Sequence, residues 1–124
     1  MFSYNFEKLE VWKLSLRIIK EVKKITKKLP LEEKYILTDQ IRRAALSIAL
    51  NIAEGWGRKT KKDFSRFISN AIGSTLEVIA CLKIACDLGY LKEEEIKDLD
   101  ELLKNNKIIR VGEWNQVFYQ IGQG

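Results

Sequence analysis

Apolar residues recur every three or four positions through four long segments of the chain, which is the pattern of amphipathic α-helices. The chain has 124 residues, which is the size of one domain with a single hydrophobic core. It contains one proline and seven glycines, so little interrupts long helices. The pattern predicts one all-α domain over 1–124 with helices at about 5–27, 32–54, 61–88 and 92–119.

Helix ends are marked by local signals. Pro30 disfavours helical geometry in the residue before it and so ends the first helix. Gly55 is predicted as a left-handed cap of the second helix, and Gly89 ends the third. Thr60 and Asp63 form the T-x-x-D spacing of a capped start to the third helix. Short links between four helices favour an antiparallel up-down-up-down bundle.

The first two helices have apolar residues on more of their circumference than one core contact needs. Leu46 and Leu50 point nearly opposite to the main apolar stripe of the second helix, and Ile18 widens the stripe of the first. Burying an exposed aliphatic side chain contributes about 1.5–3 kcal/mol, so a few such residues favour self-association. The alternative is that one chain covers both faces internally.

The residue types limit the possible chemistry. The chain has no histidine, which removes the commonest general base and metal ligand, and no phosphate-binding glycine-rich loop. Cys81 and Cys86 lie about 140° apart on a helix, so we interpret both as reduced apolar residues. We therefore predict no enzyme, no metal and no cofactor; an enzyme would need Glu54, Glu77, Asp63 or a lysine as its acid or base. The sequence has no apparent membrane span or signal peptide, so the expected location is cytoplasmic.

Four segments resemble a known family: FEKLEVWKLS, QIRRAALSIALNIAEGWGR, FSRFISNAIGSTLEV and LGYL. They look like the four-helix-bundle proteins encoded in intervening sequences of bacterial 23S rRNA genes. The resemblance implies a homopentamer without enzymatic activity. Related accessory proteins of diversity-generating retroelements form a positively charged barrel that binds nucleic acid and a reverse transcriptase. Ala49 stands where the family typically has a proline, so the second helix is expected to be straighter here.

Arg43 shares one side of the second helix with Glu54, and Glu77 lies on a polar face of the third. Near an oligomer interface a guanidinium needs a carboxylate to offset its desolvation. We therefore predict that Arg43 pairs with Glu77, or with Glu54 of a neighbouring copy, and that Arg42 is solvated. The predicted oligomer interface comprises Arg43, Leu46, Leu50, Glu54, Ile18 and Glu77.

Basic residues gather where the third helix begins. They are Arg58, Lys59, Lys61, Lys62 and Arg66. The amides at a helix N-terminus also attract anions, so this cluster is a candidate phosphate-binding site. Trp56 lies beside it in sequence and either stacks on an unpaired base or packs on the end of the bundle. The alternative for the lysines is that they only solvate the link.

A second basic strip follows the first helix and comprises Lys13, Arg17, Lys20 and Lys24. The net charge is +5, and an oligomer would repeat each basic strip. These features favour a homo-oligomer that binds RNA or DNA, with RNA preferred, mainly through the phosphate backbone. The alternative is an adaptor whose basic surface binds an acidic protein such as a polymerase or reverse transcriptase.

Overall fold

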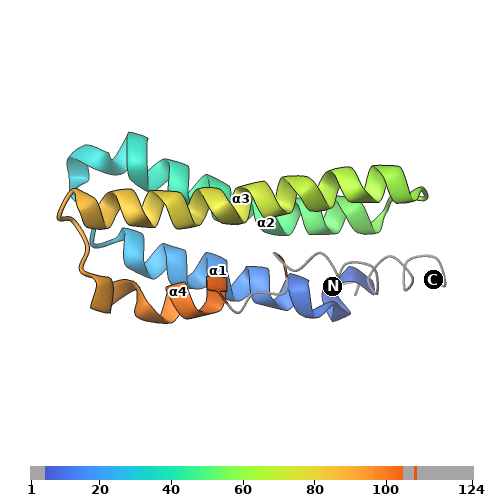
Figure 1. The fold of residues 1–124 in the computed structure, drawn as a ribbon, viewed down its shortest axis with the longest axis horizontal. Coiled ribbons are helices and arrows are strands. Elements are labelled where there is room, and N and C mark those ends of the chain that lie inside the picture. Colours follow the sequence, from blue (N-terminus) through green and yellow to red (C-terminus); the bar gives the residue numbers. More distant parts are fainter. Residues whose placement is uncertain (1–4, 105–107, 109–124) are drawn as a thin grey trace.

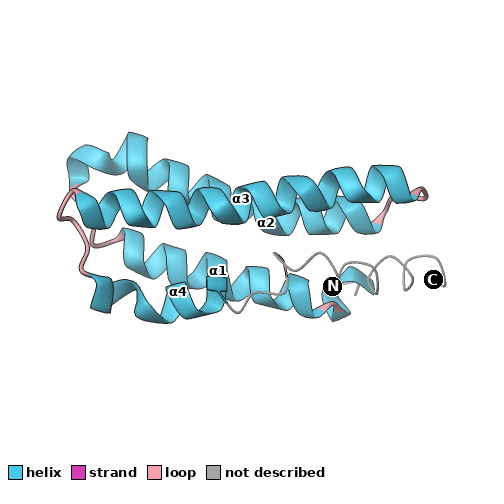
Figure 2. Ribbon diagram, viewed as in Figure 1, coloured by secondary structure: helices cyan, strands magenta, loops and turns pink. Residues whose placement is uncertain are grey.

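The computed structural model describes residues 5–104 and 108, and this part of the chain is all-α, without strands (Figure 2). The α-helices are α1 (Glu10–Thr26), α2 (Asp39–Trp56), α3 (Lys61–Asp87) and α4 (Lys97–Lys104). The prediction of an all-α fold is confirmed. Figure 1 shows the helices lying side by side along the long axis of the molecule. The main contacts join α2 to α3, α1 to α2 and α1 to α4, and α3 also contacts α4.

The start of the second helix differs from the prediction. A short 3-10 helix at Leu31–Glu33 and a π-helical stretch at Lys34–Thr38 precede α2, so regular α-helix begins at Asp39. Such π-helical turns usually occupy one turn of a helix, which is their length here. Further 3-10 helices, Asn5–Lys8 and Glu93–Ile96, precede α1 and α4. Much of the predicted fourth helix, 92–119, lies outside the described residues, which reach Lys104 in α4.

The helix-end predictions have different outcomes. Thr60 caps α3, because its side-chain oxygen accepts a hydrogen bond from the Asp63 amide at 3.2 Å. Gly89 follows α3 with a φ of +80°, a conformation that glycine adopts without strain. The prediction for Gly55 was wrong: α2 continues to Trp56, and Gly55 is buried inside the helix. Its role is spatial, because helix α3 packs closely against it.

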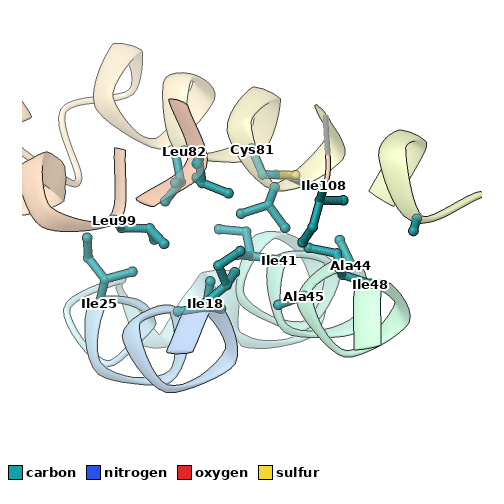
Figure 3. Close-up of a cluster of buried hydrophobic side chains, with 14 of the residues drawn as sticks. Ile18, Ile25, Ile41, Ala44, Ala45, Ile48, Cys81, Leu82, Leu99 and Ile108 are labelled. Atoms are coloured by element: carbon teal, nitrogen blue, oxygen red, sulfur yellow. The ribbon is translucent and has the colours of Figure 1, made fainter. Parts of the chain in front are cut away.

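The core lies between the helices and is mostly aliphatic. In Figure 3, Ile18 of α1, Ile41 of α2, Leu82 of α3 and Leu99 of α4 converge on one cluster. Ile18 has no exposed surface, so its assignment to an oligomer interface was wrong; most of the broad stripe of α1 is covered within the chain, and Leu16 is 38% exposed. Leu46 and Leu50 are each 50% exposed, as expected for the outward face of α2.

Helix α3 is long and apolar enough, by length and composition alone, to cross a membrane. The sequence pattern predicts no such segment, so this finding differs from the expectation. A core helix of a soluble protein passes the same test, and α3 contributes buried residues from Phe64 to Ala85 to the core. The composition of α3 therefore does not separate a membrane span from a core helix.

Candidate nucleic-acid interface

The predicted basic residues lie on two separate elements. We call Arg58, Lys59, Lys61, Lys62 and Arg66 the turn cluster, because they occupy the α2–α3 turn and the first turns of α3. We call Lys13, Arg17, Lys20 and Lys24 the α1 strip, and all four of these side chains are exposed. In Figure 1 the α2–α3 turn lies at one end of the molecule, whereas helix α1, which carries the strip, runs along its length.

Two arginines of the turn cluster share one aromatic ring. The guanidinium carbon of Arg58 lies 4.5 Å from the centre of the Phe67 ring, and that of Arg66 lies 5.0 Å from it. Both distances fall within the range of cation–π attraction. Across residues 5–104 and 108, neither arginine has a carboxylate partner. Their charge is therefore held in place without being neutralised.

Phe67 was not among the predicted site residues. Its spacing along α3 marks it as a core residue, and it is indeed buried, with 7% of its surface exposed. The contact to Arg58 crosses the α2–α3 turn, so helical periodicity gives no sign of it. The signal available in the sequence was the Gly55-x-Gly57-Arg58 segment, since glycine permits a close approach of another element.

Helix packing explains how the ring is placed. A Cβ atom added to Gly55 would lie 3.2 Å from Cβ of Phe67, which is closer than ordinary van der Waals contact. The absence of a side chain at Gly55 therefore lets α2 and α3 approach each other at this point. The Arg58 amide donates a hydrogen bond to the Gly55 carbonyl at 3.1 Å, which fixes the backbone that carries this guanidinium.

Trp56 is half-buried and packs against the hydrophobic core. Only part of its indole is open to solvent, so the available stacking surface is smaller than a fully exposed ring would offer. Trp56 therefore packs against the bundle, as one of the two predictions for it states. Stacking of a base on its remaining exposed surface stays a prediction.

The α1 strip has carboxylates as near neighbours. Lys13 pairs with Glu10 at 3.6 Å and Lys24 pairs with Glu21 at 3.4 Å, both across one helical turn. These pairs are solvent-exposed, so each contributes about 0–1 kcal/mol. Arg17 and Lys20 line a groove between α1 and α4, whose other lining residues include Leu14, Glu21, Asp98, Glu101 and Leu102. The acidic groups on α4 therefore reduce the positive potential along one flank of the strip.

The outward face formed by α2 and α3 combines half-exposed leucines with a shallow polar groove. The groove is lined by Ser47, Asn51, Ser69, Asn70, Gly73, Ser74 and Glu77. The Ser74 hydroxyl donates to the Ser47 hydroxyl at 3.0 Å, and the Asn51 amide donates to the Ser47 carbonyl at 2.8 Å. A Cβ added to Gly73 would meet nothing within 4 Å, so another backbone has room to approach here.

Arg43 does not pair with Glu77 within the chain, so that part of the prediction was wrong, whereas a pair with Glu54 of a neighbouring copy stays a prediction. Arg43 is exposed and pairs with Asp39 one turn earlier in α2 at 3.0 Å, while Glu77 accepts a hydrogen bond from Gln40 at 2.8 Å. The i,i+4 spacing places Asp39 and Arg43 on the same face of α2 one turn apart, where their side chains can meet. Arg42 donates to the Thr26 hydroxyl at 2.9 Å and so links α2 to α1, rather than being only solvated. Glu54 is exposed on the outer face of α2.

The two thiols match the interpretation of reduced, largely apolar residues. Cys81 is buried, Cys86 is half-buried, and both are free. Burial raises the pKa of both thiols, and nearby carboxylates, Glu77 for Cys81 and Glu93 for Cys86, raise it further. No group of three or more potential metal ligands occurs in the part of the chain that the structure describes.

Comparison with protein families gives one match that covers most of the chain. The family described as 23S rRNA-intervening sequence protein matches residues 7–110. That range includes all the described α-helices and both groups of basic residues. A comparison with curated proteins finds no significant match.

Proposed function

Because the chain belongs to the 23S rRNA-intervening sequence protein family, we propose that it is a non-catalytic, self-associating helical bundle that binds nucleic acid, with RNA preferred. The family description supplies the association with rRNA genes. The choice of RNA binding comes from the surface of this chain. Binding is directed at the phosphate backbone and therefore selects weakly among sequences.

The observation that carries this proposal is the turn cluster. Arg58 and Arg66 are cations without carboxylate partners in residues 5–104 and 108, and both guanidinium carbons lie within 5.0 Å of the centre of the Phe67 ring. Lys59 and Lys62 are exposed next to them. Such a concentration of positive charge attracts the phosphates of RNA or DNA and binds them by releasing counterions.

Self-association is the second part of the proposal. We infer an antiparallel up-down-up-down bundle from the short links between the helices, and a homo-oligomer from the half-exposed Leu46 and Leu50. The groove between α2 and α3 supports this inference because it offers hydroxyl and amide groups and the open space at Gly73. A pentamer remains the expected copy number from the resemblance of the sequence. Oligomerisation would repeat the turn cluster and strengthen weak phosphate contacts through multivalency.

Binding to a labelled single-stranded RNA, measured by fluorescence anisotropy at low salt, tests the proposal. The affinity is expected to fall steeply as salt is raised, because backbone contacts release counterions. The double variant Lys59→Glu/Lys62→Glu should weaken binding by at least about tenfold. The matched control Lys83→Glu/Lys97→Glu changes net charge equally at exposed positions outside the turn cluster. Equal effects of the two variants, or no binding of RNA or DNA by the wild type, would contradict the proposal.

A second candidate function is a protein-binding adaptor for an acidic partner such as a polymerase or reverse transcriptase. The observation that favours it is the apolar surface before α2, where Leu31, Tyr35 and Ile36 are 84%, 82% and 69% exposed. Large exposed apolar residues in one short segment are typical of protein-interaction surfaces. Replacing the three residues with serine should abolish binding of a purified acidic partner and leave RNA binding unchanged. RNA binding without any such partner favours the first function.

A further inference from the structure

The shared contact of Arg58 and Arg66 with Phe67 gives the turn cluster a specific geometry. Both guanidinium carbons lie within 5.0 Å of one ring centre, so they are less than about 10 Å apart. A pair of guanidiniums within that limit can reach neighbouring phosphates of the same strand. An arginine that is already held on a ring loses less conformational freedom on binding than a freely rotating one.

The chemistry of the guanidinium suits this arrangement. A guanidinium can be attracted to an aromatic ring and still donate its N–H groups to phosphate oxygens. Since neither guanidinium has a carboxylate partner in the described part of the chain, a phosphate does not have to displace an existing ion pair. Asp63 lies in the same first turn of α3, and no ion pair joins it to either arginine.

Gly55 determines where the ring lies. Gly55 has ordinary helical geometry, since Gly89 is the glycine with positive φ among the described residues, so backbone freedom does not explain a glycine here. Space does explain it: a Cβ would lie 3.2 Å from Phe67 Cβ and 3.8 Å from Phe64 Cδ2. An alanine at this position would force Phe67 to shift by a few tenths of an ångström, which disturbs the position of the ring relative to Arg58.

We propose that Gly55 and Phe67 are positioning residues that hold the Arg58 and Arg66 guanidiniums as a paired binding site for the backbone phosphates of a nucleic acid. This inference rests on the proposed function and specifies its site. It gives the Gly55-Trp56-Gly57-Arg58 segment a physical role, with Gly55 setting the helix approach and Arg58 supplying one donor group. It also places the main contact with nucleic acid on phosphate rather than on bases stacked against Trp56.

The test compares Phe67→Leu, which keeps a buried apolar side chain, with Phe67→Tyr, which keeps the ring. Each is titrated with the same single-stranded RNA over a series of salt concentrations. Phe67→Leu should bind about five- to tenfold more weakly, and the slope of log affinity against log salt should fall by about one. Phe67→Tyr should stay within about twofold of the wild type, because it preserves the cation–π contacts.

If Phe67→Leu folds poorly, the variant Gly55→Ala and the NMR signals of the two arginines test the same proposal. Gly55→Ala should weaken RNA binding in the same direction as Phe67→Leu. In the wild type, the Nε–H resonances of Arg58 and Arg66 should be displaced by the ring current of Phe67, and Gly55→Ala should move them toward ordinary values. Circular dichroism checks that each variant remains helical.

The outcomes separate the two proposals. If Arg58→Ala/Arg66→Ala weakens binding while folded Phe67→Leu and Gly55→Ala bind RNA as the wild type does, the positioning role is overturned and nucleic-acid binding stands. If the wild type binds neither RNA nor DNA at low salt, the proposed function fails and the positioning role fails with it. Weakened binding by Phe67→Leu with rescue by Phe67→Tyr supports both.

Discussion

The α1 strip and the turn cluster carry the same kind of charge in different surroundings. Lys13 and Lys24 in the strip each face a glutamate one turn away, and α4 places further carboxylates beside Arg17 and Lys20. In the turn cluster, two arginines are held on an aromatic ring. The surroundings of the basic residues therefore indicate their capacity to bind phosphate better than the number of basic residues in the sequence does.

This difference has an energetic basis. Exposed ion pairs are weak, so a phosphate can displace the glutamates of the strip, but the displaced carboxylate stays nearby and repels the incoming phosphate. Among residues 5–104 and 108, the arginines over Phe67 have no carboxylate partner that would compete with a phosphate, and their cation–π contacts restrict their conformations. We expect the turn cluster to dominate the affinity and the α1 strip to extend the contact weakly.

The largest expected effect concerns assembly, because assembly repeats both surfaces. Leu46→Ser/Leu50→Ser removes apolar surface from the outward face of α2, where each leucine is 50% exposed. The variant should sediment as a smaller species and bind long RNA on the order of 10²-fold more weakly, through loss of multivalency. Sedimentation velocity and anisotropy measure the two effects.

The control for this variant is Leu31→Ser/Ile36→Ser, which removes apolar surface before α2 and should leave the assembly intact. If the wild type sediments as a monomer at every concentration, multivalency does not contribute to its binding of RNA. The turn cluster and the α1 strip would then have to be compared within one chain.

The next largest effect compares the two surfaces directly. Arg58→Ala/Arg66→Ala should weaken binding to a short RNA by about tenfold, whereas Arg17→Ala/Lys20→Ala should weaken it by about threefold. Both variants remove two positive charges, so a general electrostatic effect would be equal. Anisotropy titrations at one fixed salt concentration distinguish them. If the α1 variant has the larger effect, the ring-held arginines are not the main contact.

The sequence predicted the all-α fold and the cap at Thr60, because these depend on periodicity and on short-range signals. It placed the start of the second helix near residue 32, whereas regular α-helix begins at Asp39. It did not predict that Ile18 is covered, since a broad apolar stripe looks the same whether the same chain or a second copy covers it. Nor did it predict that Phe67 contacts Arg58. That contact depends on how closely α2 and α3 approach at Gly55, which is a property of their packing.

Arg43 illustrates the same limit at shorter range. The helical wheel placed it toward Glu77 of another helix, but Asp39 lies one turn away in its own helix and pairs with it at 3.0 Å. A local partner requires less ordering of the side chain than a distant one. A carboxylate four residues away in the same helix can be recognised in the sequence, and it competes with carboxylates of other helices for the same arginine.

A smaller change in RNA affinity is expected when the carboxylates beside the α1 strip are neutralised. Glu10→Gln/Glu21→Gln removes the two carboxylates that pair with Lys13 and Lys24. RNA binding should become about two- to threefold tighter, because the lysines keep their charge while the nearby repulsion of phosphate disappears. Competition titrations against the wild type resolve a change of this size. Unchanged affinity would indicate that bound RNA lies away from the strip.

The smallest expected effect is that of pH. The chain has no histidine, and arginine and lysine stay protonated between about pH 6 and pH 7.5. Burial raises the pKa of Cys81 and Cys86, so both thiols remain neutral and add no negative charge in this range. The pKa of Glu95 is lowered mainly by its contact with Lys28, so its stabilising contribution is present above its ordinary pKa and is lost only as the pH falls through the lowered value.

Both surfaces should therefore bind RNA with an affinity that changes by less than about twofold over this pH range at constant ionic strength. Anisotropy titrations in matched buffers measure it, and thermal unfolding checks that stability is equally flat. A tenfold change would mean that a titrating group controls binding. That result would place the binding site away from both the turn cluster and the α1 strip.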